Sequence, residues 1–318
     1  MDRGFLTPAE ITQGFVDTGI KKVNQPAIKL FLLGILAGAF IAFAAEGSNV
    51  ATHTIESVGI AKALAGALFA TGLMMVLVAG AELFTGNSLI VVSCLERRTS
   101  WLGLLRNWLF VYLGNFVGSM IVVLLILGSG QFNFSGGMLG GYTIKVATYK
   151  VGLTWESALL MGILCNWLVC LAVWMASGAK DMAGKLLAIF FPIWLFVTSG
   201  FEHSIANMFY VPAGILAKGN ATWVTQAMSL GVSADKINAL GWTSFINNNL
   251  VPVTLGNIIG GTLFVGAVYW VTYLQGRKPA LVSRPAGAAS TPGRKSELAP
   301  SQSRTGHVSK ERLPASAD

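Results

Sequence analysis

Two stretches decide the fold: Gly80-Ala81-Glu82-Leu83-Phe84-Thr85-Gly86-Asn87 and Gly200-Phe201-Glu202-His203-Ser204-Ile205-Ala206-Asn207. Both read Gly-x-Glu with an Asn five residues after the Glu, and both interrupt apolar sequence. A second repeated pattern, Gly-Asn-x-x-Gly, begins at Gly114 and again at Gly256. Polar groups within a membrane are tolerated where they face protein or a water-filled cavity, and paired broken helices in two related halves mark transport sites. The pattern predicts a channel or transporter built from two halves.

The composition is that of a membrane protein. Hydrophobic residues make up 53% of the chain, charged residues only 11%, and the mean hydropathy is +0.63. Most of the formal charge of +8 comes from residues 277–318, which hold eight Lys or Arg and three Asp or Glu. The rest of the chain therefore lacks the charge of a nucleic-acid-binding protein. The three cysteines have no CxxC spacing, so we interpret them as buried thiols and predict neither a metal site nor a cofactor.

Six apolar segments are long enough to cross a membrane. They are approximately 28–45, 63–81, 107–127, 157–179, 186–217 and 250–274. The second ends at the first polar stretch, with residues 83–95 as a short half-helix, and the fifth is broken at 200–203. Lys and Arg are twice as frequent in the short loops on the side of the amino terminus, which favours two cytoplasmic termini. Three segments per half make the halves inverted. We predict an all-α polytopic membrane protein with two inverted three-segment repeats.

Two segments flank the predicted channel domain of residues 26–276. Residues 1–25 include Thr7-Pro8-Ala9-Glu10, which resembles a capping box, and an amphipathic helix over about 8–22 would lie at the lipid surface. Residues 277–318 contain no aromatic residue and half of the ten prolines. We predict a disordered, basic cytoplasmic tail, whose role the sequence does not specify.

The second polar stretch carries the best candidate for function. His203 is the only histidine within an apolar segment, and imidazole can offer a positive charge or a proton near neutral pH. Glu202 could pair with Lys150, although Lys150 could equally be a solvated loop residue. Glu82 could instead cap the freed amides of the first break. Gly86 and Asn87 are further break residues there, as Gly200 is in the second break. The alternative for His203 is a neutral imidazole bound to backbone.

Several asparagines accompany these candidates. Asn115 and Asn257 lie beside close-packing glycines, so we interpret them as helix-contact residues. Asn166 is an isolated amide in the fourth segment and must face the interior or the pore. No HExxH, nucleophile elbow or cluster of His and Cys at metal-ligand spacing is present, so we do not expect an enzyme. An anion accompanied by a proton fits a single histidine beside helix amides better than a cation does.

At these motifs the chain resembles the formate/nitrite transporter family over about residues 5–275. The resemblance rests on 81–85, 166–172, 199–208 and 252–257. It implies an aquaporin-like fold and a homopentamer with one pore per subunit, in lipid of the bacterial inner membrane. The central axis of that pentamer is not the substrate path.

The resemblance also implies roles for individual residues. His203 matches the pore histidine and Thr85 its hydrogen-bonding partner. Leu73 and Leu83 match the inner constriction, and Phe196 matches the outer one. A polar network that attracts anions is matched by Lys150, Glu202, Asn166 and Asn207. The basic tail is a departure, since relatives usually end soon after the last segment.

The substrate is less closely determined. The Asn-Leu-Val-Pro-Val-Thr run at 249–254, with Phe201 and Ile205, is more similar to formate channels. Gly86-Asn87 and Cys165-Asn166-Trp167 also occur in nitrite-type members. We therefore predict a passive or proton-coupled formate channel, with nitrite or hydrosulfide as the alternative. The direction of flux and its gating by pH stay open. A neutral-solute channel would show two Asn-Pro-Ala elements, which the sequence lacks.

Overall fold

The computed structural model describes residues 3–276, so the predicted tail at 277–318 lies outside the described residues. Within that range the chain is a bundle of helices, and its only β-type pairing is an isolated bridge between Phe5 and Ala179. Five helices are long and apolar enough to cross a membrane, and three shorter apolar helices accompany them. The predicted all-α class is confirmed.

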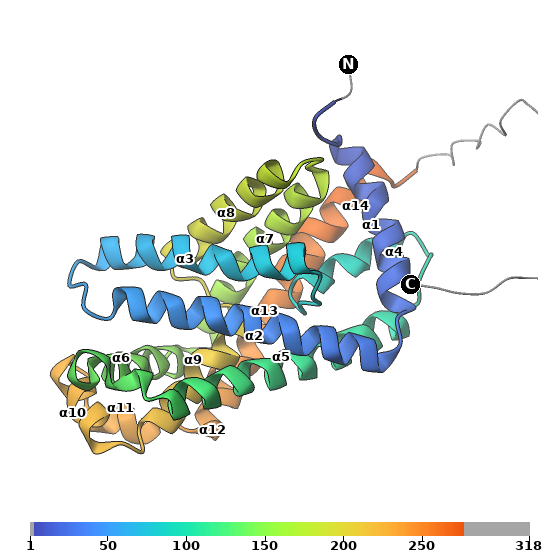
Figure 1. Ribbon diagram of the computed structural model, residues 1–318. Helices are drawn as coiled ribbons and strands as arrows, with labels where there is room; N and C mark the ends of the chain where they lie inside the picture. The colour runs from blue at the N-terminus through green and yellow to red at the C-terminus, as the bar shows by residue number, and fades with distance from the viewer. Residues whose placement is uncertain (1–2, 277–318) are drawn as a thin grey trace, which may run out of the picture. The chain divides into compact units, whose positions relative to one another are not determined.

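The first half begins with α1 (Pro8–Val23), which crosses the end of the bundle (Figure 1). Thr7 and Glu10 form the predicted capping box, which satisfies amides at the start of α1. There follow α2 (Ala27–Thr52), α3 (Val58–Ala79), the 3-10 turn η1 (Gly86–Ile90), α4 (Val91–Leu95) and α5 (Trp101–Ser129). The break after α3 and the short half-helix beyond it lie where the sequence predicted them.

The second half repeats this order. After the 3-10 turn η2 (Gln131–Asn133) come α6 (Phe134–Val151), α7 (Trp155–Gly178), α8 (Met182–Thr198) and α9 (Ser204–Ala217). The short helices α10 (Ala221–Ser229) and α11 (Ala234–Ala239) lead into the last segment. That segment comprises α12 (Trp242–Ser244), the π-helical turn η3 (Phe245–Leu250), α13 (Val251–Gly261), the π-helical turn η4 (Thr262–Ala267) and α14 (Val268–Tyr273). Because α8 and α9 meet at 199–203, the predicted fifth segment is two half-helices.

Helix α6 was not anticipated from the sequence. Its start is irregular, because Ser135, Gly136 and Gly137 all have positive φ angles. The following residues form a regular helix that ends near Lys150, although none of the six predicted segments includes it. Helix α6 stands in the second half where α1 stands in the first.

The two halves pack in equivalent ways. Helix α2 lies against α5 in the first half, as α7 lies against α13 in the second, and α3 packs on α8 between them. In each of the pairs α2–α5 and α7–α13, the two helices come closest at glycines. A Cβ atom on Gly114 would lie 3.0 Å from the Cα of Gly34, and one on Gly256 would lie 3.0 Å from the Cα of Gly162. Side chains there would force the helices apart, so the repeated Gly-Asn-x-x-Gly pattern sets the spacing in both halves.

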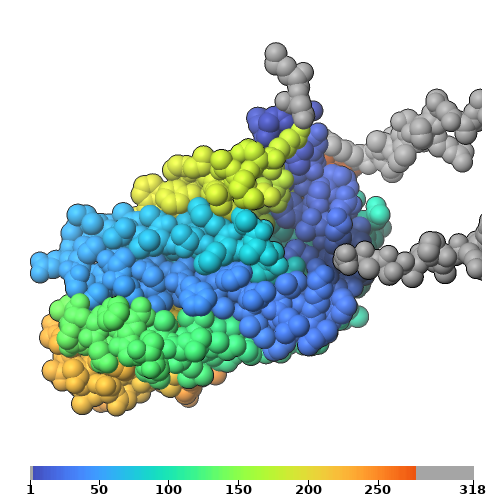
Figure 2. All heavy atoms as spheres, viewed as in Figure 1, coloured from blue at the N-terminus to red at the C-terminus, as the bar shows by residue number. Residues whose placement is uncertain are grey.

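The outside of the bundle is strongly apolar. Large side chains of α5, α8 and the last segment are exposed, including Leu125, Phe191 and Leu263. On the face in Figure 2, α3, α2 and the α5–α6 region lie side by side as a continuous surface. A surface of this kind is stable in lipid or against another apolar surface.

Candidate functional site

The two breaks meet in the middle of the bundle. Gly80 ends α3 in the left-handed region at φ 84°, and Gly200 does the same after α8 at φ 76°. A side chain is strained in this conformation, which explains the glycine at the head of each stretch. Residues 81–83 and 201–203 then run without helical structure before the next helix begins. The two breaks meet at Thr85 and His203, whose side chains are in contact inside the protein.

His203 is buried at the start of α9 and bridges the breaks. The N–H of Ala206 donates to its Nδ1 over 3.1 Å, so the imidazole is the N-cap of α9. A nitrogen that accepts a hydrogen bond carries no proton, so the neutral ring carries its proton on Nε2. Nε2 lies 3.0 Å from Oγ1 of Thr85, in the first break. The ring therefore donates to the hydroxyl of Thr85, whose own hydrogen is free to point elsewhere.

Two phenylalanine rings lie on one side of His203. The ring of Phe196 is stacked near His203 with centroids 6.1 Å apart, and Phe69 meets Phe196 edge-on at 5.8 Å. These three side chains line one cavity of about 440 Å³ together with Lys150 and Glu202. The cavity is the wider of the two approaches to the histidine, and we call it the outer vestibule, following the predicted orientation. The predicted outer constriction, Phe196, lies on its wall.

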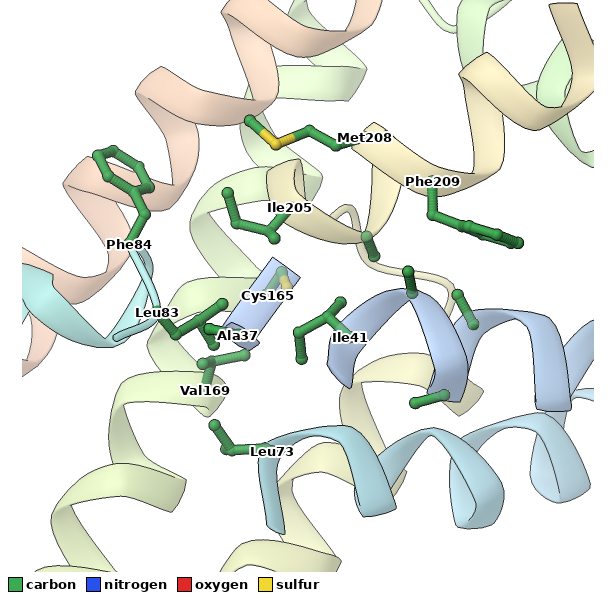
Figure 3. Close-up of a cluster of buried hydrophobic side chains, with 14 of the residues drawn as sticks. Ala37, Ile41, Leu73, Leu83, Phe84, Cys165, Val169, Ile205, Met208 and Phe209 are labelled. Atoms are coloured by element: carbon green, nitrogen blue, oxygen red, sulfur yellow. The ribbon is translucent and has the colours of Figure 1, made fainter. Parts of the chain in front are cut away.

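A second cavity of about 140 Å³ approaches from the opposite end, and we call it the inner cavity. Leu73 and Leu83, predicted to form the inner constriction, both line it and are both buried. Figure 3 shows these two leucines in one apolar cluster with Ile41 and Val169, contributed by α3, the first break, α2 and α7. An apolar narrowing of this kind resists hydrated ions.

A charged cluster lies beside the histidine at the outer vestibule. Nζ of Lys150, at the end of α6, lies 2.9 Å from Oε1 of Glu202, and its ammonium lies over the ring of Tyr210 at 5.1 Å. The amide of Asn207 donates to Oε2 of Glu202 over 2.7 Å, and that of Asn249 donates to the same oxygen over 3.2 Å. The carboxylate is thus paired and hydrogen-bonded, as a buried charge must be. The structure brings Lys150, Glu202 and Asn207 together, as the sequence suggested.

An equivalent cluster lies at the inner cavity. Nζ of Lys22, at the end of α1, lies 2.6 Å from Oε2 of Glu82, and the amide of Asn87 donates to the same oxygen over 2.8 Å. Asn87 also donates to Oδ1 of Asn107, whose own amide donates to the carbonyl of Lys22. Glu82, which we had interpreted as a cap for the break, is therefore the carboxylate of a second Lys–Glu–Asn–Asn cluster.

The side-chain amides of one asparagine in α5 and one in α13 form hydrogen bonds with the backbone of the breaks. Asn115 accepts from the N–H of Phe84 and donates to the carbonyls of Gly34 and Glu82. Asn257 makes the matching bonds to Ser204, Gly162 and Glu202 in the second half. They do more than join helices, because they satisfy backbone groups that the breaks leave unpaired.

Asn166 ties the two halves together. Its amide donates to the carbonyl of Thr85 over 3.1 Å and to that of Asn257 over 2.6 Å. The bond to Thr85 fixes the residue that partners the histidine. The predicted break residue Gly86 starts η1, where a Cβ would meet only Val173 at 3.6 Å, so close packing does not require glycine there.

The model of the family described as "Formate/nitrite transporter" matches residues 9–271. The chain belongs to the formate/nitrite transporter family. The formate channel FocA of Escherichia coli K12 is 40% identical over 275 residues, which cover 85% of this chain and 95% of that protein. A probable formate transporter of Methanothermobacter thermautotrophicus is 38% identical over 293 residues, covering 86% of this chain and all of that protein.

Solved structures of the family share the fold. The structure titled "Pentameric formate channel with formate bound" superposes with a TM-score of 0.70 at 40% identity and covers 78% of this chain and 98% of that chain. A second, titled "FNT family ion channel", gives 0.69 at 26% identity and covers 83% of this chain and 98% of that one. The fold that the family resemblance implied is thereby confirmed.

Three residues of the two clusters escaped sequence reasoning, namely Lys22, Asn107 and Asn249. The repeat in the sequence could have predicted all three. Asn107 and Asn249 are separated by the same 142 residues as the Gly114 and Gly256 patterns. Extending the repeat outward from the glycines would have found the asparagines, and aligning α1 with α6 would have found Lys22.

One buried charge in this family member lacks a partner. Glu46 of α2 is 3% exposed, and neither of its carboxylate oxygens has a hydrogen-bond partner. No group of three or more metal-ligating side chains occurs within residues 3–276, so Glu46 is not part of a metal centre there.

Proposed function

We propose that this protein conducts formate across the cytoplasmic membrane of a bacterium. It would act as a homopentamer with a separate pore in each subunit, and both termini would be cytoplasmic. The observation that carries the proposal is the His203–Thr85 pair, which lies between two cavities that approach it from opposite ends. Relatives named as formate channels or transporters support the substrate, and the pentameric neighbour supports the assembly.

Each mouth attracts an anion in the same way. An ammonium group, Lys150 outside and Lys22 inside, lies at the cavity with its carboxylate partner held by amides. A small anion can approach the ammonium, whereas the hydrogen-bonded carboxylate keeps the charge from becoming a trap. Binding must be weak enough to allow release if a pore is to conduct.

The constriction then takes the anion out of water. A carboxylate in an apolar passage loses several kcal/mol of hydration unless it is neutralised or hydrogen-bonded. The hydroxyl of Thr85, which accepts from Nε2 of His203, can donate its hydrogen to the carboxylate. Protonation by hydronium from the acidic side, which leaves a water molecule behind, would complete the neutralisation, so formate would cross with a proton. Since Nδ1 accepts from Ala206, the neutral imidazole serves as a hydrogen-bond donor through Thr85 rather than as a fixed charge.

The experiment is a flux assay with the purified full chain in liposomes. Formate, nitrite, hydrosulfide, lactate and glycerol are supplied in turn at acidic and neutral external pH. We expect formate to be fastest and to enter faster at acidic pH, with intraliposomal acidification. If nitrite or hydrosulfide flux is faster than formate flux, that anion is the substrate instead. Glycerol flux without anion flux would overturn the proposal. Conduction without turnover of formate would also support a role in transport rather than catalysis.

A further inference from the structure

The outer vestibule is larger and more positive than formate requires. Its volume of about 440 Å³ is many times the roughly 30 Å³ that one water molecule occupies in the liquid. Three lysines line it, namely Lys62, Lys145 and Lys150, and Glu202 is the only carboxylate on the described wall. A single formate ion would leave most of this space and charge unused.

Two of these lysines are unpaired. Lys150 is neutralised by Glu202 at 2.9 Å. Within residues 3–276, neither Lys62 nor Lys145 forms an ion pair with a carboxylate. Lys62 comes from α3 and Lys145 from α6, on different elements of the wall. Both residues are exposed, so the vestibule carries two solvent-accessible positive charges that a ligand could balance.

A buried donor on the same wall also lacks a partner. Asn49 of α2 is 3% exposed and lines the vestibule, and its Nδ2 has no hydrogen-bond acceptor. Its neighbours on α2 do not share this condition, since Ser48 donates to the carbonyl of Ala44 and Thr52 donates to that of Ser48. An unsatisfied buried donor is destabilising, and a ligand oxygen that accepts from it would remove that cost.

We propose that the outer vestibule is a binding site for a dicarboxylate dianion. Lys62 and Lys145 would each balance one carboxylate, and Nδ2 of Asn49 would donate to a carboxylate oxygen. The dianion cannot follow formate, because beyond Phe69 and Phe196 lie the buried apolar side chains of Leu73 and Leu83, where two charges would have to be desolvated. The bound dicarboxylate is therefore a blocker of formate entry. The claim that the dicarboxylate blocks formate flux rests on the proposed function, whereas the claim that it binds in the vestibule does not.

The block is sided. The inner cavity holds about 140 Å³, and its lining contains one lysine, Lys22, which is paired with Glu82 at 2.6 Å. It therefore has neither the room nor the spare charge of the outer vestibule. Dicarboxylate added at the outer mouth should slow formate flux, and dicarboxylate at the inner mouth should not.

Binding to the purified full-chain protein tests the site directly. Isothermal titration calorimetry with succinate is compared with acetate and with the uncharged diamide succinamide. We expect succinate to bind more tightly than either, and Lys145→Gln or Lys62→Gln to weaken it on the order of tenfold, the effect of one charge-assisted hydrogen bond. Asn49→Ala should weaken it as well. The control is Lys236→Gln, an exposed lysine of α11 that does not line the vestibule and should leave binding unchanged.

The outcomes separate the site from the function. Succinate that binds no better than acetate, or that binds equally well to Lys145→Gln and the control, overturns the site. Binding that depends on Lys62 and Lys145 in a protein that conducts no formate would keep the site and refute the proposed function. In right-side-out and inside-out vesicles, block from both sides alike would refute the assignment to the outer vestibule.

Discussion

Removing the ammonium group of Lys150 tests how much the buried Lys150–Glu202 ion pair contributes to stability. Lys150→Met keeps much of the side-chain length and leaves Glu202 without its cation. The side chain of Glu202 is 2% exposed and that of Lys150 is 11% exposed, so solvent cannot replace the lost partner. Breaking a buried ion pair costs about 3–5 kcal/mol. Because Asn207 and Asn249 still donate to Oε2, we expect a loss near the lower end, about 3 kcal/mol.

The inner cluster provides the matched comparison. The side chain of Lys22 is 23% exposed and that of Glu82 is 7% exposed, so water screens this pair more strongly. We expect Lys22→Met to cost about 1–2 kcal/mol, less than Lys150→Met, although the ion pair at Lys22 is the shorter one. Distance alone would predict the reverse order.

Thermal unfolding of the detergent-solubilised protein measures both losses. About 3 kcal/mol corresponds to a midpoint lowered by roughly 6–12 °C in a chain of this size. The double variant Lys150→Met/Glu202→Gln removes both charges and should recover most of the loss, since no uncompensated carboxylate remains. The reasoning is refuted if the double variant is no more stable than Lys150→Met, or if Lys22→Met is the more damaging single change.

Three further predictions follow from the packing. Leu83→Ala or Phe196→Ala should widen the path and admit lactate, which liposome flux assays would detect; unchanged size selectivity in both would place the narrow points elsewhere. Gly256→Ala should lower stability by about 1–3 kcal/mol because its Cβ would lie 3.0 Å from the Cα of Gly162, and a thermal midpoint equal to wild type would contradict that close contact. Glu46→Leu should raise the thermal midpoint, since its buried carboxylate has no partner, and a lowered midpoint would show that the carboxylate is stabilised in the assembled protein.

Repetition in the sequence was sufficient to predict the breaks. A Gly-x-Glu pattern within apolar sequence has few physical solutions in a membrane, and a histidine in one break marks the place where polarity is needed. Those features depend on local sequence alone, and the structure places His203 and Thr85 in contact at 3.0 Å. The functional roles of the site residues remain predictions.

The polar partners of the breaks were harder to predict. Lys22 reaches Glu82 from 60 residues away in sequence, and Asn249 reaches Glu202 from 47. Such contacts depend on which helix faces which break, and the hydrophobic pattern of all-round apolar helices does not encode it. Helix α6 was missed for a different reason, because its irregular glycine-rich start hides a regular helix.

The central claim is that His203 and Thr85 together carry the anion past the constriction. The most direct test is formate uptake into liposomes by His203→Asn at acidic and neutral external pH. Asparagine is a good N-cap, so the start of α9 should persist while the imidazole is lost. We expect the oligomer to stay assembled and formate flux at acidic pH to fall about tenfold to a hundredfold, because Thr85 loses the donor that orients its hydroxyl toward the anion, an effect as large as one hydrogen bond to a charged group. Wild-type uptake at acidic pH in this assembled variant would contradict the account.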